Sequence, residues 1–118
     1  MNLKFSAKSV SYEEALDGEI IQVIFDEDPY DDPMNRHSKS VCASINYEFS
    51  PRELKFDWVD GPEFNGGIKA QKYTFTENNF SAKLENGILF EISHSADVET
   101  YQKIRKLLLK EVGRPENA

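Results

Sequence analysis

This chain of 118 residues has few of the residues and motifs from which an enzyme reaction can usually be recognised. It contains one cysteine and two histidines, and it has no glycine-rich phosphate loop, no paired-cysteine metal motif and no nucleophile signature. Cys42 cannot form an internal disulfide, and no residue near it in sequence would activate it. His37 and His94 lack partners at the spacing of zinc ligands. The sequence therefore predicts no cofactor, no metal site and no enzyme activity.

Long apolar runs are also missing. No stretch approaches the roughly 20 residues that are needed to span a bilayer, and residues 1–10 lack the basic and apolar regions of a signal peptide. We therefore expect a reducing, cytoplasmic location. The length predicts a single domain over residues 1–118, with an ordered core at about 2–113 and a frayed tail at 114–118.

Positive charge is absent from a long early segment. No Lys or Arg occurs in residues 9–35, whereas nine carboxylates fall within residues 13–32. The net charge of −7 argues against binding to nucleic-acid phosphates or to anionic membranes, because both need clustered Lys and Arg. So strong a concentration of one sign predicts a single negative region, which suits a basic protein partner.

Alternation of apolar and polar residues is the dominant pattern. It is clearest over residues 41–49 and recurs over residues 3–7, which predicts strands with one buried face. Near Asn86-Gly87 a three-residue loop is preferred to a two-residue loop. It pairs Ala82 with Phe90 and places six apolar side chains of the hairpin on one face.

Only one segment has a clear helical period. Apolar residues recur at threes and fours from Val98 to Val112, and Gly113 and Pro115 end the pattern. Ser95 is expected to cap the start of this helix. Strands with one apolar face, followed by one amphipathic helix, predict an α+β fold. We expect a curved antiparallel β-sheet of about six or seven strands with the C-terminal amphipathic helix packed on it.

Candidate partner-binding residues lie in the acidic segment and in a glycine-flanked stretch. Tyr30 lies among the carboxylates and adds rigid contact area that a purely solvated loop does not need. The acidic segment does not match the EF-hand spacing, so a solvated loop or a protein-binding surface is favoured over a Ca²⁺ site. Phe64 is interpreted as part of a binding loop flanked by glycines. The alternative is that Trp58 is a core aromatic and that the residues after it form only a long turn. The predicted partner-binding residues are Asp26, Glu27, Asp28, Tyr30, Asp31, Asp32 and Phe64.

Several short motifs follow one another in an order that is typical of a known family. An opening strand at residues 3–8 precedes an acidic hinge, an apolar strand and a central strand with Ile45-Asn46-Tyr47-Glu48. Gly66-Gly67-Ile68, a hairpin and a closing helix at residues 101–108 complete the series. This order resembles bacterial immunity protein family ten, whose members are encoded beside polymorphic toxins and are expected to neutralise them by direct binding. Residues 29–40 depart from the family pattern, so the identity of the toxin stays open.

The resemblance implies an immunity protein that neutralises a cognate bacterial toxin by occlusion, and it carries over no catalytic residue. Two other functions are left open. One is a small-molecule-binding module with a pocket between sheet and helix near Trp58, Tyr73 and Tyr101. The other is a non-catalytic regulatory domain that dimerises through an exposed edge strand at residues 3–9. We expect a monomer or a homodimer.

Overall fold

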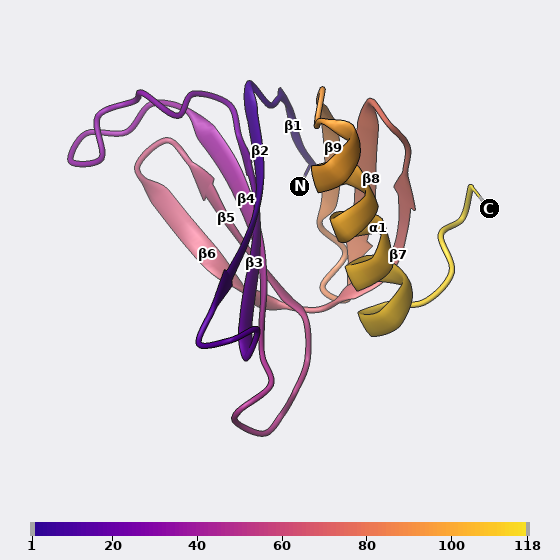
Figure 1. Ribbon diagram of the computed structural model, residues 1–118. Helices are drawn as coiled ribbons and strands as arrows, with labels where there is room; N and C mark the ends of the chain where they lie inside the picture. The colour runs from indigo at the N-terminus through magenta and orange to yellow at the C-terminus, as the bar shows by residue number, and fades with distance from the viewer. Residues whose placement is uncertain (1, 118) are drawn as a thin grey trace.

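Two β-sheets and one helix make up the fold in the computed structural model, which describes residues 2–117 (Figure 1). The four-stranded sheet has the spatial order β1 (Asn2–Ser6), β9 (Leu89–Ser93), β8 (Asn79–Leu84) and β7 (Ala70–Phe75). The five-stranded sheet has the order β2 (Ser9–Ala15), β3 (Ile20–Asp26), β4 (Lys39–Asn46), β5 (Lys55–Asp60) and β6 (Glu63–Ile68). Helix α1 (Val98–Glu111) follows β9.

The α+β class, the mainly antiparallel pairing and the single C-terminal helix are confirmed. The strands differ from the expectation in number and grouping, because nine strands form two sheets where six or seven were expected in one. One pairing, between β1 and β9, is parallel. Within residues 2–117, no helix is long and apolar enough to cross a membrane.

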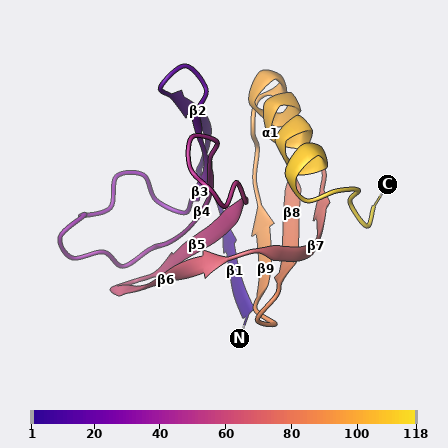
Figure 2. The same ribbon diagram turned by 90° about the horizontal axis from the view of Figure 1, so that it is seen from below.

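The chain passes directly from one sheet to the other at two corners. At the first corner the Ala7 N–H donates to the Ser93 carbonyl of β9, and the Lys8 N–H donates to the Asp26 carbonyl of β3, both at 2.8 Å. At the second corner β6 ends at Ile68 and β7 begins two residues later. Figure 2 shows the two sheets as separate layers, with α1 on the side where they diverge. At the first corner the inward-facing apolar positions change from Leu3, Phe5 and Ala7 to Val10 and Tyr12. Such a break in alternation does not reveal that the strands on its two sides belong to different sheets.

Aromatic side chains from both layers fill the space between the sheets. Phe25 of β3 stacks on Phe80 of β8 with ring centroids 5.1 Å apart. Phe90 of β9 lies 6.1 Å from Phe56 and 5.7 Å from Trp58, both on β5. Burial of a large apolar side chain contributes roughly 1.5–3 kcal/mol, so this cluster is a main source of cohesion between the layers.

The three-residue loop of the β8–β9 hairpin is confirmed. Ala82 pairs with Phe90, and the Leu84 N–H donates to the Ile88 carbonyl at 2.8 Å. Gly87 has a φ of 91°, a left-handed conformation that glycine adopts without a steric penalty. The six apolar side chains of the hairpin therefore lie in the core or pack against it, as predicted.

The bounds of α1 agree with the predicted helix, but its cap does not. Asp97, rather than Ser95, caps the helix, because its carboxylate accepts a hydrogen bond from the Thr100 N–H at 2.8 Å. Val98 is 77% exposed, although the periodic pattern placed it on the buried face. The apolar pattern thus begins one turn before Tyr101, the first helix residue that packs against the core.

The C-terminal tail lies along β7 as far as the structure describes it. The Glu116 N–H donates to the Tyr73 carbonyl at 2.8 Å. The Asn117 amide accepts from the Phe75 N–H at 3.1 Å and donates to the Phe75 carbonyl at 3.2 Å. The tail, which the sequence predicts to be frayed, thus has hydrogen bonds to β7 at residues 116 and 117, and residue 118 lies outside the described residues.

His94 is buried where the layers meet the start of the helix. Its Nδ1 accepts from the Ala96 N–H at 3.2 Å, so the neutral ring donates from Nε2 to the Thr76 carbonyl at 3.1 Å. The ring also stacks on Phe75, with centroids 5.5 Å apart. Burial lowers the pKa of His94 below its ordinary value. The imidazole thus stabilises the fold in its neutral form.

We expect the free energy of unfolding to decrease as the pH falls below the ordinary histidine value of 6.5. Below that pH the unfolded chain binds a proton that the folded chain does not bind. His94→Gln should remove most of this dependence, measured by urea unfolding between about pH 7.5 and about pH 5.5. His37→Asn is the matched control, because His37 is exposed. Equal pH dependence in the wild type and H94Q would contradict this role.

Candidate functional site

The nine carboxylates of residues 13–32 do not form the single negative region that the sequence predicts. Strands β2 and β3 pair as a hairpin, with Ser9 opposite Asp26 at one end and Ala15 opposite Ile20 at the other. A strand rises about 3.3 Å per residue, so Glu19 and Asp26 are about 20 Å apart. The first four carboxylates therefore lie on β2 and its turn, and the last five lie at the other end of β3.

The loop between β3 and β4 meets the tip of the β5–β6 hairpin. The Gly61 N–H donates to the Ser38 carbonyl at 3.1 Å, and Lys39 pairs with Asp60 across β4 and β5. Figures 1 and 2 both show the loop and the hairpin projecting from the same end of the five-stranded sheet. We refer to residues 26–39 together with residues 60–64 as the acidic end.

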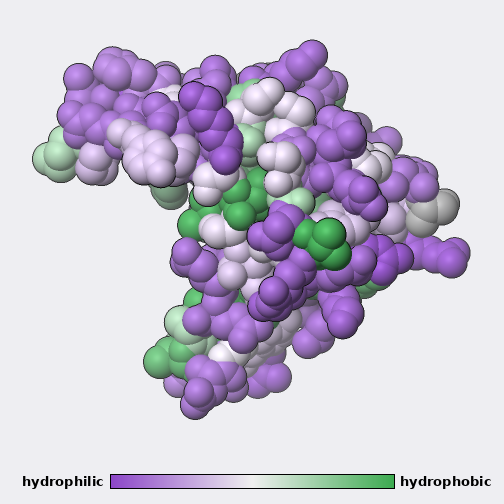
Figure 3. All heavy atoms as spheres, turned by 45° about the horizontal axis from the view of Figure 1, so that its top comes forward, coloured by the Kyte–Doolittle hydropathy of each residue, from purple (hydrophilic) through white to green (hydrophobic). Residues whose placement is uncertain are grey.

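The acidic end combines an excess of carboxylates with exposed apolar side chains. Against two cations, Arg36 and Lys39, it carries seven carboxylates: Asp26, Glu27, Asp28, Asp31, Asp32, Asp60 and Glu63. Tyr30, Met34 and Phe64 are 94%, 91% and 70% exposed. Figure 3 shows the loop as a mainly hydrophilic arm that projects from the body of the molecule. Tyr, Phe and Met are enriched at interfaces, so this composition favours a binding surface over a merely solvated loop.

Asp31 holds the loop together. Its Oδ2 accepts from the Ser38 hydroxyl at 2.6 Å and from the N–H groups of His37 and Ser38 at 2.8 Å each. Its Oδ1 accepts from the Asp32 N–H at 2.8 Å. The Ser38 hydroxyl and these backbone groups favour the charged carboxylate, and they hold the pKa of Asp31 well below its ordinary range.

Asp26 and Glu27 fasten the base of the loop. Asp26 forms a partly buried ion pair with Arg36 at 2.6 Å, and Glu27 accepts from the Lys39 N–H at 2.9 Å. The other two loop carboxylates, Asp28 and Asp32, each accept only one hydrogen bond within residues 2–117.

Asp28 and Asp32 each accept a hydrogen bond from the N–H two residues further on, at Tyr30 (3.0 Å) and Met34 (2.9 Å). These local turns fix the backbone on which the two exposed apolar side chains stand. The carboxylates thus bind to their own loop, and among residues 2–117 no group of three or more His, Cys, Asp or Glu is placed to hold a metal ion.

Phe64 lies on an edge strand, not in the glycine-flanked binding loop that the sequence suggested. Gly61, with a φ of 62°, and Pro62 form the two-residue turn of a hairpin in which Asp60 pairs with Glu63. Phe64 pairs with Val59 on the outer face of the five-stranded sheet. Glycine is needed later in the strand, because a Cβ at Gly66 would lie 2.8 Å from the Asp57 Cα.

The three side chains that could carry proton or thiol chemistry are not brought together. Cys42 lies on the outer face of β4, where burial and the Asp57 charge raise the pKa of its thiol. His94 lies in the core, on the other side of that sheet, and His37 is exposed in the loop. A thiol with a raised pKa is a poor nucleophile, so these residues do not form a nucleophile and base pair.

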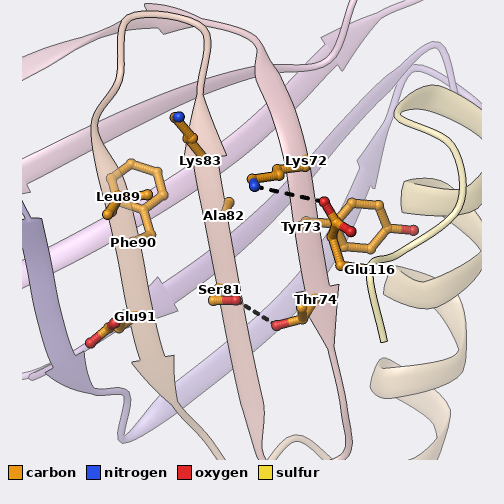
Figure 4. A pocket seen from close by; sticks show the side chains of 10 residues that line it. All are labelled: Lys72, Tyr73, Thr74, Ser81, Ala82, Lys83, Leu89, Phe90, Glu91 and Glu116. Carbon is orange, nitrogen blue, oxygen red and sulfur yellow. Dashed lines mark hydrogen bonds and ion pairs between the residues drawn. The ribbon is translucent and has the colours of Figure 1, made fainter. Parts of the chain in front are cut away.

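Two shallow hollows lie away from the acidic end. One of about 340 Å³ lies over Thr74, Ser81 and Leu89 on the four-stranded sheet, where Lys72 pairs with Glu116 at 3.8 Å (Figure 4). Its lining is mainly apolar, with Thr74 and Ser81 as its short polar side chains, and it is open to solvent.

The other hollow, of about 400 Å³, lies between α1 and the β2–β3 hairpin. Tyr12, Tyr47 and Lys106 line it, whereas the predicted pocket residue Trp58 is buried in the core. A hollow between sheet and helix thus exists, but different residues form it.

We expect Asp31→Asn to loosen the loop, because an amide cannot accept the bonds that both carboxylate oxygens now accept. Exchange of the His37 and Ser38 amide protons, measured by NMR, should become about tenfold faster. Asp32→Asn is the matched control: it removes the same charge but keeps an oxygen for the Met34 N–H. Unchanged exchange in D31N would show that the loop is held by other contacts.

The acidic end is thus an ordered, charged surface with exposed apolar side chains. Comparisons of the chain with protein-family models, with curated proteins and with solved structures find no match. The resemblance to bacterial immunity protein family ten therefore stays a prediction, and function is inferred from the acidic end itself.

Proposed function

We propose that this protein is an immunity protein that binds a basic cognate toxin through the acidic end and neutralises it by occlusion. The observation that carries the proposal is the ordered surface that combines seven carboxylates with the exposed side chains of Tyr30, Met34 and Phe64. Toxins that act on nucleic acid need a positive cleft, and carboxylates can occupy such a cleft in place of substrate phosphates.

Order in the acidic end supports tight binding. A loop already fixed by Asp31 and by the Asp26–Arg36 ion pair loses less conformational entropy on association than a mobile loop. The charges speed the encounter, and the exposed apolar side chains supply contact area once water is expelled. Occlusion of this kind needs no cofactor and no catalytic residue. We place the protein in the cytoplasm, where the producing cell would need protection.

A small-molecule-binding module is the second candidate, favoured by the hollow between α1 and the β2–β3 hairpin. Two of its polar side chains, Tyr47 and Lys110, are already engaged, however. The Tyr47 hydroxyl donates to Glu111 at 2.8 Å, and Lys110 Nζ lies 4.6 Å from the centroid of the Tyr47 ring. No strongly exposed apolar side chain of residues 2–117 lines this hollow, whereas Tyr30, Met34 and Phe64 are exposed at the acidic end.

Protection of growth tests the proposal in cells. The toxin domain encoded beside this gene should arrest a bacterial host, and co-expression of this protein should restore growth. The variant Cys42→Ser, which lies outside the acidic end, should protect as well as the wild type, because occlusion needs no thiol. Absence of an adjacent toxin gene, or growth arrest despite co-expression, would contradict the immunity function.

Association kinetics test the role of charge. Asp28→Asn/Asp32→Asn removes two charges while each amide oxygen can still accept its backbone bond, so the loop should keep its shape. Binding to the toxin domain should slow by about threefold or more at low salt, and the difference should shrink as salt screens the field. Asp17→Asn/Glu19→Gln is the matched control, since it removes two exposed charges at the other end of β3. Equal slowing by both variants in stopped-flow measurements would show that net charge matters and the acidic end does not.

A further inference from the structure

Strand β6 is the least protected of the four sheet edges. The edges are β1 and β7 in one sheet and β2 and β6 in the other. The tail hydrogen-bonds along β7, α1 lies against β2, and β1 carries Lys4. Natural edges are guarded by such covers, by lysines or by prolines.

Within Glu63–Ile68 there is no Lys, Arg or Pro, and five of the six residues are exposed. The irregular register with β5 falls beyond Asn65, so the first part of the strand is regular. The strand thus begins with an open, regular edge at the acidic end.

Backbone groups of Phe64 point toward this open edge. Asp60 and Glu63 flank a two-residue turn, which makes them a hydrogen-bonded pair of the hairpin. Hydrogen-bonded and non-hydrogen-bonded pairs alternate in an antiparallel ladder. The next pair, Val59 with Phe64, is therefore non-hydrogen-bonded, and the N–H and carbonyl of Phe64 face away from β5.

We propose that a β-strand of the basic partner adds to the free edge of β6 and extends the five-stranded sheet. This inference rests on the proposed function and names the way in which the toxin is held. Main-chain hydrogen bonds to Phe64 would supply affinity, and its 70% exposed ring beside Val59 would contact alternate side chains of the added strand.

The negative charge beside the free edge of β6 favours a positively charged partner strand. Glu63 lies on β6 itself, and the hydrogen bond between Gly61 and Ser38 keeps the acidic loop beside the start of the strand. An added strand that carries Lys or Arg would meet these carboxylates. A second copy of this chain would bring a net charge of −7 against another −7, so the committed occupant is a basic partner strand.

Two substitutions of Phe64 distinguish the contribution of its backbone N–H to binding from the contribution of its ring. Phe64→Pro removes the outward N–H, and it removes no hydrogen bond to β5 because Phe64 donates none to that strand. Phe64→Ala removes the ring and keeps the N–H. We expect F64P to bind the toxin domain at least about tenfold more weakly than F64A does, in titration calorimetry with both folds checked by circular dichroism. Equal affinity of the two variants, with tight wild-type binding, would overturn strand addition and leave the immunity function intact.

A peptide probe tests strand addition to the edge of β6 without the toxin. It also decides whether strand addition occurs if F64P does not fold or if the wild type does not bind the toxin. The probe is a peptide of about seven residues that alternates Lys and Val, with two twins that are N-methylated on one edge or on the other. We expect NMR shifts at β6 with the parent peptide and with one twin only. Shifts confined to residues 26–32, equal binding of the twins, or no binding would overturn the proposal. A dimer in analytical ultracentrifugation that F64P abolishes would also overturn it, by naming a second copy as the occupant.

Discussion

The two sheets can bury their apolar faces only against each other, and one helix is available to close the side on which they diverge. The aromatic cluster between the layers, in which Phe25 stacks on Phe80 and Phe90 contacts Trp58, meets this constraint. His94 is drawn into the same interior and is held there as a neutral ring. Among residues 2–117 no Asp, Glu, Lys or Arg is buried, so the charged side chains of this part of the chain lie on the outer sheet faces, on the helix and at the sheet ends.

Carboxylates at the acidic end have two roles that the structure separates. Asp31 and Asp26 bind backbone or guanidinium groups and order the loop, whereas Asp28 and Asp32 each fix a single turn. Removing all four charges at once would change the loop as well as the field around it. The proposed binding surface therefore depends on a loop whose shape and charge come from the same residues.

The local sequence pattern was enough to predict some elements of the fold but not others. The β8–β9 hairpin and the helix were predictable because their periods and glycines lie within one short stretch. The division into two sheets was not, since the first corner depends on hydrogen bonds between residues distant in sequence, such as Ala7 with Ser93. The edge strand β6 was not predictable either, because its glycines resemble those of a loop. Of the predicted site residues, Asp26 to Asp32 and Phe64 do come together at one end. Asp60, Glu63 and Phe64 are brought there by strand pairing that sequence spacing does not reveal. Met34 lies in the same loop as Asp32, and its 91% exposure is what the sequence did not show.

The most direct test of the central claim is amide hydrogen exchange, followed by mass spectrometry, on this protein alone and bound to the toxin domain. The proposed function predicts slower exchange on binding at residues 26–39 and 60–68, with β7, β8 and the β2–β3 turn unchanged. Protection confined to the hollow between α1 and the β2–β3 hairpin, with free exchange at the acidic end, would contradict it.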